Sequence, residues 1–539
     1  MNRLSVIVPC LVAALACTRG TRAPGDAGVP AVEGVSAPSA GPAPADPWLE
    51  GLPYPAMREG TPKRGGTLTV RVYAEPPSLN RFTDSDYVLK QLTDGLVQET
   101  LARVDGTKPP DFPLVPLLAE RSETTPDGTG VTFHLRANVR WHDGTPFTGH
   151  DVVASVRKVL DPKVRSMHLR NYLEDLESID VDAAAPLVVR ARWKRPYFMA
   201  FRFLATTLPL LPKHVLDAGG DLLSHPVHRA PIGTGPFRFE EWKTADRITF
   251  VRNDDYRGPP AHLDRLVFRL VPEDAVAFQL LQKGEFDLYL RLNAQQWAYD
   301  MPALDGLRRD YHRARYFFPN YSWVGWNMRL PQFSDARVRR ALALLMDRDG
   351  LRRHYLHGID AHATCHFFRD STSCDPALQP LPWDPREGRR LLDEAGWRDT
   401  DGDGVREKDG VPFRFTYLVP ASSAFGIKLG AYLQQEYRRH GIEVDVKKVE
   451  WSVFVQMLRE HDFGACMLGW AYNDPVIDPF QIFHSAQADG GSNYVSFADP
   501  EADRLIEQAR GTLDDDARAA LFRAFGRILY DRQPYTFLF

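Results

Sequence analysis

Alternating hydrophobic and polar residues predict a strand at residues 131–135, and a helical pattern follows at residues 152–160. In the strand, every second residue is apolar, which is the period of a half-buried strand. His142–Pro146 between them, HDGTP, has the glycine and proline of a tight turn. Thr148 or His150 can open the helix, whose apolar residues recur at helical spacing. The stretch therefore predicts a strand, a turn and a helix.

The same patterns predict strands and helices along most of the chain from residue 64. Strands are expected at Thr67–Val72, Arg238–Trp242, Arg247–Arg252, Leu266–Leu270, Phe286–Leu290, Arg414–Leu418, Glu443–Val449 and Ala465–Gly469. Helices are expected at Leu89–Leu101, Glu273–Lys283, Pro385–Gly396, Ile427–His440, Trp451–Arg459, Pro500–Gly511 and Ala517–Arg532. Strands that alternate with helices favour parallel sheets. A chain of 539 residues is too long for one core, so two or three lobes are expected.

The N-terminal region is typical of an export signal followed by a tether. Arg3 supplies the positive charge and Leu4–Ala16 the apolar run of a secretory leader, which we place at residues 1–17. The sequence ALAC at 14–17 resembles a lipobox, although leucine is expected where Ala14 stands. Lipidation of Cys17 is therefore expected, with ordinary signal cleavage as the alternative. Residues 18–63 are rich in Ala, Pro, Gly and Ser, which predicts a flexible tether.

Composition and missing motifs exclude several classes of function. A net charge of −4 gives no basic field for nucleic acid or anionic lipid. After the N-terminus, no apolar run reaches the roughly 20 residues of a membrane helix. The sequence has no Gly-x-Ser-x-Gly elbow, no His-Glu-x-x-His motif and no P-loop. His142 and Asp143 are neighbours on one turn, where two side chains seldom reach the same substrate atom. A secreted hydrolase is thus an unfavoured alternative.

Two cysteines of the folded region predict a disulfide. Cys365 and Cys374 enclose a short loop, and in an oxidising compartment we expect them to pair. A metal site at Cys365 and His366 is the weaker alternative, because no second ligand pair has zinc spacing.

An acidic segment at residues 399–410 matches half of a calcium-binding loop. Asp399, Asp401 and Asp403, with Gly404, occupy positions 1, 3, 5 and 6 of the pattern. Position 12 should be a glutamate that closes the site, but it is Gly410. A solvated turn is therefore favoured over a calcium site.

Several motifs, in order, resemble the family 5 extracellular solute-binding proteins. Residues 133–152 are similar to that family's Phe-x-Leu-Arg…Trp-x-Asp-Gly-x-Pro-Phe…Asp-Val signature. The Gly-Gly pair at 65–66, the Gly-Thr-Gly-Pro-Phe turn at 233–237 and the Asp-x-Arg-Val-Arg-x-Ala-Leu helix at 335–342 are also similar. The family comprises the dipeptide-, oligopeptide- and nickel-binding components of ABC importers. The resemblance runs from Gly65 to Phe539.

This resemblance implies an α/β, two-lobed, periplasmic-binding-protein-like fold (type II, peptide-binding class), with an inserted subdomain in the first lobe. The first lobe is expected at residues 64–320, the inserted subdomain at about 100–197, and the second lobe at 321–539. Crossings between lobes are expected at Tyr321–Asn327 and near Tyr535, with closure by hinge motion. Relatives continue from there into the first lobe; either this sequence is truncated or its first lobe forms without that segment.

The function implied by the resemblance is capture of a peptide-like or other small solute in an interlobe cleft. The solute would be delivered to an ABC permease in the membrane, with no cofactor and no nucleic acid involved. The protein is expected to be exported, periplasmic, lipid-anchored and monomeric. A binding protein with a receptor or chaperone role is the alternative, and neighbouring permease and ATPase genes would favour import.

Ligand-contacting residues are expected in three segments. Glu75 lies in the loop after the first strand, which reaches the cleft in relatives. Trp326 and Asn327 are candidates at the crossing, with a plain core position as the alternative for Trp326. The third segment, at 469–475, contributes Trp470, Tyr472, Asn473 and Asp474.

The third segment departs from the Gly-Trp-x-x-Asp motif whose aspartate holds the ligand's α-ammonium in peptide-binding relatives. Asn473 occupies the aspartate position, and Asp474 is displaced by one residue, so in extended chain it faces the other way. A buried ammonium without a carboxylate costs several kcal/mol. We therefore expect weak binding of peptides with free N-termini, and favour blocked, cyclic or non-peptide ligands. The alternative is that a local bulge re-aims Asp474 into the cleft.

Overall fold

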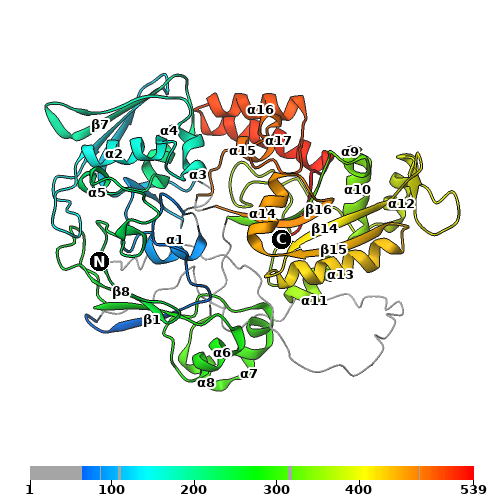
Figure 1. The fold of residues 1–539 in the computed structure, drawn as a ribbon, viewed down its shortest axis with the longest axis horizontal. Helices are drawn as coiled ribbons and strands as arrows, with labels where there is room; N and C mark the ends of the chain where they lie inside the picture. Colours follow the sequence, from blue (N-terminus) through cyan, green and yellow to red (C-terminus); the bar gives the residue numbers. More distant parts are fainter. Residues whose placement is uncertain (1–62, 85, 107, 109–110, 314–318, 473) are drawn as a thin grey trace.

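The computed structural model describes residues 63–539, apart from 85, 107, 109–110, 314–318 and 473. The predicted leader, nearly all of the tether, and Asn473 lie outside the described residues. Figure 1 shows three groups of elements, each built on its own sheet. They are the first lobe, its inserted subdomain and the second lobe, so the expected architecture is confirmed.

The first lobe contains a mixed four-stranded sheet of order β1-β10-β9-β8, at the lower left of Figure 1. Strands β1 and β10 are parallel, and the pairs β10–β9 and β9–β8 are antiparallel. Apolar side chains of the strands pack with α1 in one core. The elements of this lobe are β1 (Thr67–Val72), α1 (Tyr87–Thr93), β8 (Phe237–Lys243), β9 (Arg247–Arg252), β10 (Arg265–Leu270), α6 (Asp274–Gln282), η4 (Gln296–Asp300), α7 (Met301–Ala303) and α8 (Asp305–Asp310).

Two elements of this lobe differ from the sequence-based prediction. The helix expected at Leu89–Leu101 ends at Thr93, because Gly95 adopts a φ of 71° and turns the chain. The strand expected at Phe286–Leu290 is reduced to one bridge between Leu288 and Val70. Beside that bridge, the backbone N–H of Thr69 donates a hydrogen bond to the side-chain carboxylate of Asp287 at 2.7 Å.

The inserted subdomain is an antiparallel sheet of order β4-β5-β7-β6, with α2 packed against it. Helix α2 begins after Thr148, one of the two predicted starts, whose backbone N–H donates to the Asp151 carboxylate at 2.8 Å. The core of the subdomain continues to Val227, past the expected end near Tyr197. Its elements are β2 (Ala102–Val104), β3 (Leu114–Pro116), β4 (Ala119–Thr124), β5 (Gly130–Leu135), α2 (Gly149–Leu160), α3 (Met167–Arg170), η1 (Asn171–Leu173), β6 (Leu176–Asp182), β7 (Ala185–Trp193), α4 (Met199–Arg202), η2 (Phe203–Thr207), α5 (Lys213–Asp217) and η3 (Pro226–His228).

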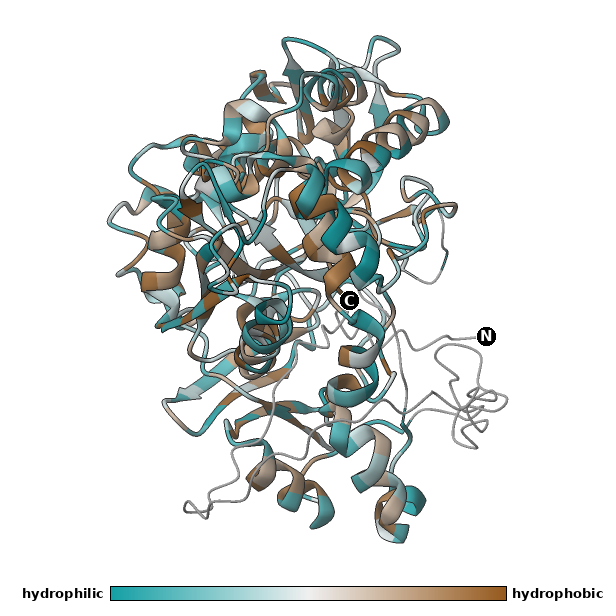
Figure 2. Ribbon diagram, turned by 90° about the vertical axis from the view of Figure 1, so that its right-hand side faces the viewer, coloured by the Kyte–Doolittle hydropathy of each residue, from teal (hydrophilic) through white to brown (hydrophobic). Residues whose placement is uncertain are grey.

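The second lobe is a five-stranded sheet of order β15-β14-β16-β11-β17, with helices on both faces. Strands β15 and β16 are parallel to β14, while β11 is antiparallel to β16 and β17. In Figure 2 helices carry bands of hydrophilic and hydrophobic residues, as expected of helices with one buried face.

The bounds of the second-lobe strands are β11 (Asn320–Trp326), β12 (Glu407–Lys408), β13 (Val411–Pro412), β14 (Arg414–Pro420), β15 (Glu443–Val449), β16 (Ala465–Ala471) and β17 (Tyr535–Phe537). The bounds of its helices are α9 (Pro331–Ser334), α10 (Ala336–Leu345), α11 (Arg348–Leu356), α12 (Pro385–Glu394), α13 (Ala424–Arg438), α14 (Trp451–Arg459), α15 (Phe480–Phe483), η5 (Ser485–Gln487), α16 (Pro500–Gly511) and α17 (Asp515–Arg532).

The first lobe connects to the second between α8 and β11. Strand β17 pairs with β11 inside the second-lobe sheet, so the stretch near Tyr535 belongs to that lobe and does not cross. The inserted subdomain also contacts the second lobe, where Tyr197 donates its hydroxyl hydrogen to Asp478 at 2.9 Å. Within the described part of the chain, no helix combines the length and apolar character that a membrane span requires.

Candidate functional site

A cavity of about 850 Å³ lies between the two lobes. The first lobe lines it with residues 287–292, Trp297 and residues 310–313. The second lobe lines it with the first residues of β11, the last residues of β16 and the loop 359–369. This volume is in the range of cavities that bind small molecules. Because neither lobe forms the walls alone, a bound molecule would contact both.

Two of the predicted site residues, Trp470 and Tyr472, line this cavity. The Trp470 ring lies near-parallel to Trp323 and Tyr494, with centroid distances of 6.0 Å and 6.2 Å. Trp323 in turn stacks on Tyr535 at 3.8 Å. This stack fixes the Trp470 ring, so the second lobe presents a pre-formed aromatic wall.

A buried polar pair, Tyr321 and His366, supports the same wall. The Tyr321 hydroxyl lies 2.7 Å from His366 Nδ1. Burial lowers the pKa of His366 to about 3, so its imidazole is neutral near neutral pH. Burial also raises the pKa of Tyr321 well above its usual value. The pair therefore adds no net charge to the wall near neutral pH.

A disulfide closes the loop that carries His366. Cys365 and Cys374 are joined, with their Cα atoms 6.4 Å apart, and both line the cavity. The Cys365 sulfur is therefore not available as the metal ligand of the alternative interpretation. Asp375, directly after the loop, binds Arg527 of α17 at 2.7 Å. The loop is thus held at both ends beside the cavity.

The first lobe brings a positive charge to the cavity through Arg291, which lies between α6 and η4. Its guanidinium lies 4.9 Å from the centroid of the Tyr73 ring. Burial lowers the pKa of Arg291 from its ordinary value, and the neighbouring Arg71 acts in the same direction. No described carboxylate forms an ion pair with Arg291, so its positive charge is available to a ligand in the cavity.

Trp326 and Asn327 were predicted at the cleft, and the structure places both elsewhere. Strand β11 reaches the cavity at Asn320 and ends at Trp326, about 20 Å further along the strand. Trp326 is fully buried and donates to Thr536 Oγ1 at 3.2 Å, so the plain core alternative is correct. Asn327 donates its amide to the Phe463 carbonyl oxygen at 2.8 Å and braces the end of the strand.

Glu75 and Asp474 also lie outside the cavity lining. Glu75 accepts a hydrogen bond from Trp242 Nε1 at 2.7 Å, within the first lobe. Asp474 Oδ2 accepts one from Arg202 Nε of the inserted subdomain at 2.6 Å. Asp474 is therefore engaged with a guanidinium of the protein itself, against the alternative that a bulge directs it into the cleft.

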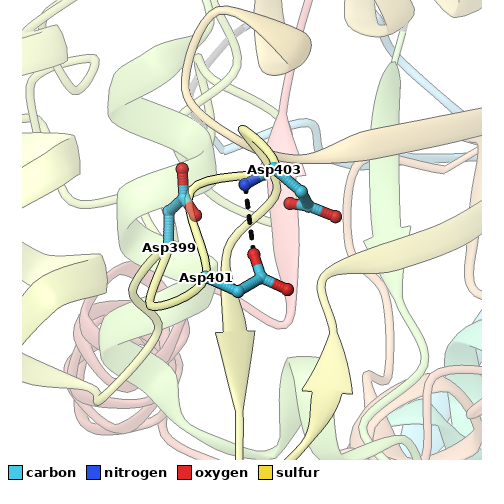
Figure 3. A group of neighbouring side chains, drawn as sticks. All are labelled: Asp399, Asp401 and Asp403. Atoms are coloured by element: carbon cyan, nitrogen blue, oxygen red, sulfur yellow. Dashed lines mark hydrogen bonds between the residues drawn. The ribbon is translucent and has the colours of Figure 1, made fainter.

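The three aspartates of the acidic segment form an exposed turn between α12 and β12, shown in Figure 3. Each carboxylate accepts a backbone N–H of the turn; Asp401, for example, accepts the N–H of Asp403 at 3.1 Å. Glu407, the next acid in the segment, accepts hydrogen bonds from Thr400. One ligand oxygen of each of the three aspartates lies within 4.8 Å of the others, so the solvated turn stays a prediction.

Sequence patterns did not identify several residues that line the cavity. They include two tryptophans, a cationic residue and the last residue of the chain: Trp297, Trp451, Arg291 and Phe539. Only Trp451 had a signal in the sequence, since it begins an amphipathic helix. In the structure its side chain is about half exposed. The other three reach the cavity through the apposition of the lobes.

Comparison with known proteins places this architecture in a family. The model of "Bacterial extracellular solute-binding proteins, family 5 Middle" matches residues 113–493. The oligopeptide-binding protein AppA of Bacillus subtilis is 28% identical over 499 residues, which cover 89% of this chain and 87% of that protein. The nickel-binding periplasmic protein of Escherichia coli is 26% identical over 455 residues, covering 83% and 84%.

Solved structures give the same result. The structure of AppA from Bacillus subtilis in complex with a nonapeptide has a TM-score of 0.76 and 26% identity, covering 89% of this chain and 93% of that one. NikA from Brucella suis in complex with Fe(III)-EDTA has a TM-score of 0.75 and 24% identity, covering 88% and 93%, and supports the fold. This chain belongs to the bacterial extracellular solute-binding proteins of family 5.

Proposed function

We propose that this protein is the substrate-binding component of an ABC importer. It captures a peptide-like or other small solute between its lobes and delivers it to a membrane permease, without changing a bond of the solute. The observation that carries this proposal is the cavity of about 850 Å³ lined by both lobes. A solute that contacts both lobes stabilises their closed arrangement over any open one, and this difference drives closure.

The nature of the walls favours an organic solute over a bare metal ion. The described lining is rich in aromatic side chains, and both of its cysteines are tied in the disulfide. The oligopeptide-binding relative from Bacillus subtilis points to peptides as the first class to test. Because Asp474 already binds Arg202, peptides with a blocked N-terminus are expected to bind at least as well as those with a free one.

Export and anchoring complete the proposal. The leader-like residues 1–17 and the Ala/Pro/Gly-rich segment 18–63 support an exported protein that is lipidated at Cys17 and works as a tethered monomer beside its permease. A lipid anchor with a tether of this length leaves the two lobes free to reach the permease.

Native mass spectrometry of the protein purified from its own host tests the binding function. We expect a small molecule bound one to one, which is lost when the protein unfolds. Trp470→Ala should lower its occupancy, because it removes the aromatic wall. Trp383→Ala is the matched control, since Trp383 is 53% exposed and is not part of the cavity lining. Absence of a bound molecule, together with no stabilisation by di- to pentapeptides, would contradict the proposal.

A further inference from the structure

We infer that the ligand carries an anionic oxygen group, such as a carboxylate, and that Arg291 binds this group. The inference rests on the proposed function, because it concerns the solute of the same cavity. Arg291 is placed on the first-lobe wall, opposite the aromatic wall of the second lobe. Its guanidinium is stacked on Tyr73, which orients the planar group.

The charge of Arg291 is not compensated by any residue that the structure describes. Among the residues that the structure describes, none forms an ion pair or a side-chain hydrogen bond with it. Asp274 is the carboxylate with the strongest electrostatic effect on Arg291, and it forms an ion pair with Arg71 at 2.7 Å. Asp274 is therefore engaged with Arg71, and no described carboxylate is paired with Arg291.

The other charged groups of the lining are already engaged. Asp287 accepts the Thr69 N–H, and Asp310 is paired with Arg309. Asp360 likewise has an interaction partner. Each of these acids has a partner within the protein, whereas Arg291 has no ion pair or side-chain hydrogen bond with the described chain. A partly desolvated guanidinium gains most from a ligand that supplies the missing anion.

A second hydrogen-bond donor lies next to Arg291 on the same wall. Tyr289, two residues earlier, also lines the cavity, and its hydroxyl oxygen accepts from Arg71 Nη1 at 3.2 Å. Its own hydrogen is donated to no residue in the described ranges. Both side chains line the same cavity and are two residues apart in the chain. Arg291 and Tyr289 can therefore donate together to one carboxylate.

The rest of the cavity defines the body of this ligand. Trp297 stands on the same lobe as Arg291, while Trp470 and Tyr472 face from the other lobe. These rings favour an apolar or aromatic body over a strongly hydrated one. The ligand class that fits both features is an organic acid with an apolar body, including a peptide with a free C-terminal carboxylate.

Isothermal titration calorimetry with paired peptides tests this inference. Each N-acetylated di- to pentapeptide is prepared as the C-terminal acid and as the C-terminal amide, and both are titrated into the wild-type protein. We expect the acid to bind about 10- to 100-fold more tightly than the amide, the usual effect of a charged hydrogen bond. Arg291→Gln should remove this preference with little change in amide binding.

Arg269→Gln is the matched control, because Arg269 lies on β10 in the same lobe and pairs with Glu285 outside the cavity lining. It should keep the full preference for the acid. Equal binding of acid and amide by the wild type would overturn the inference and leave the proposed function standing. Failure of every peptide, in both forms, to bind would count against both. The wild-type comparison decides even if Arg291→Gln does not fold.

Discussion

The ion pair between Arg202 and Asp474 leads to a quantitative prediction. The two side chains are 14% and 10% exposed, and Arg202 Nε lies 2.6 Å from Asp474 Oδ2. Asp474→Asn keeps the shape of the side chain but leaves a buried guanidinium without its anion. We expect a loss of about 3–5 kcal/mol in the free energy of unfolding. Arg202→Met combined with Asp474→Asn removes both charges and should recover much of that loss.

Urea unfolding of the two single variants and the double variant gives the coupling energy from a double-mutant cycle. The exposed pair Arg195 and Asp175, also part of the inserted subdomain, is the control, and its cycle should give less than about 1 kcal/mol. Coupling below about 0.5 kcal/mol at Arg202 and Asp474 would refute the structural role. Loss of affinity for free-amine peptides in Asp474→Asn, at unchanged stability, would instead assign this carboxylate to the ligand's ammonium.

Three further predictions concern the buried histidine, the disulfide and the anchor. The pKa of His366 falls from 6.5 to about 3 on folding, so its contribution to stability is complete above about pH 6.5 and is lost as the pH falls toward 3. His366→Gln should therefore reduce the pH slope of the unfolding free energy between pH 4 and 6 by about 1.4 kcal/mol per pH unit, and an unchanged slope would contradict a neutral buried imidazole. Alkylation without reductant, followed by mass measurement, should leave Cys365 and Cys374 unmodified, and replacing both by serine should cost about 2–3 kcal/mol; two modified thiols would reject the bridge. Cys17→Ala should move the protein from the membrane fraction of its host to the soluble fraction, and unchanged membrane association would reject the lipid anchor.

The fold was largely predictable because its strands and helices have clear periodicity. Strand β1, strand β15, helix α14 and helix α16 have the predicted bounds. The hydrophobic pattern gave a wrong prediction in two places, and in each a single residue changed the local backbone structure. Gly95, with its positive φ, ended α1 early, and the Asp287 carboxylate bonds to the backbone of β1 where a further strand was expected.

The site was less predictable than the fold, because a cavity between lobes depends on which end of each element reaches it. Trp470 and Tyr472 were identified from a motif at the end of β16, and they line the cavity. Trp326 belongs to a similar aromatic segment, but it stands at the far end of β11 and packs in the core. Arg291 follows a predicted strand, and nothing in the neighbouring sequence indicates its role. That role depends on nearby carboxylates, which already bind other groups of the protein.

Small-angle X-ray scattering of the protein with and without ligand tests whether a solute closes the two lobes around the interlobe cavity. The ligand is the one identified by native mass spectrometry or a peptide shown to bind by calorimetry. We expect a smaller radius of gyration at saturation, and an unchanged radius for Trp470→Ala at a ligand concentration too low for this variant to bind. An unchanged radius for the saturated wild-type protein would contradict capture by closure of the lobes.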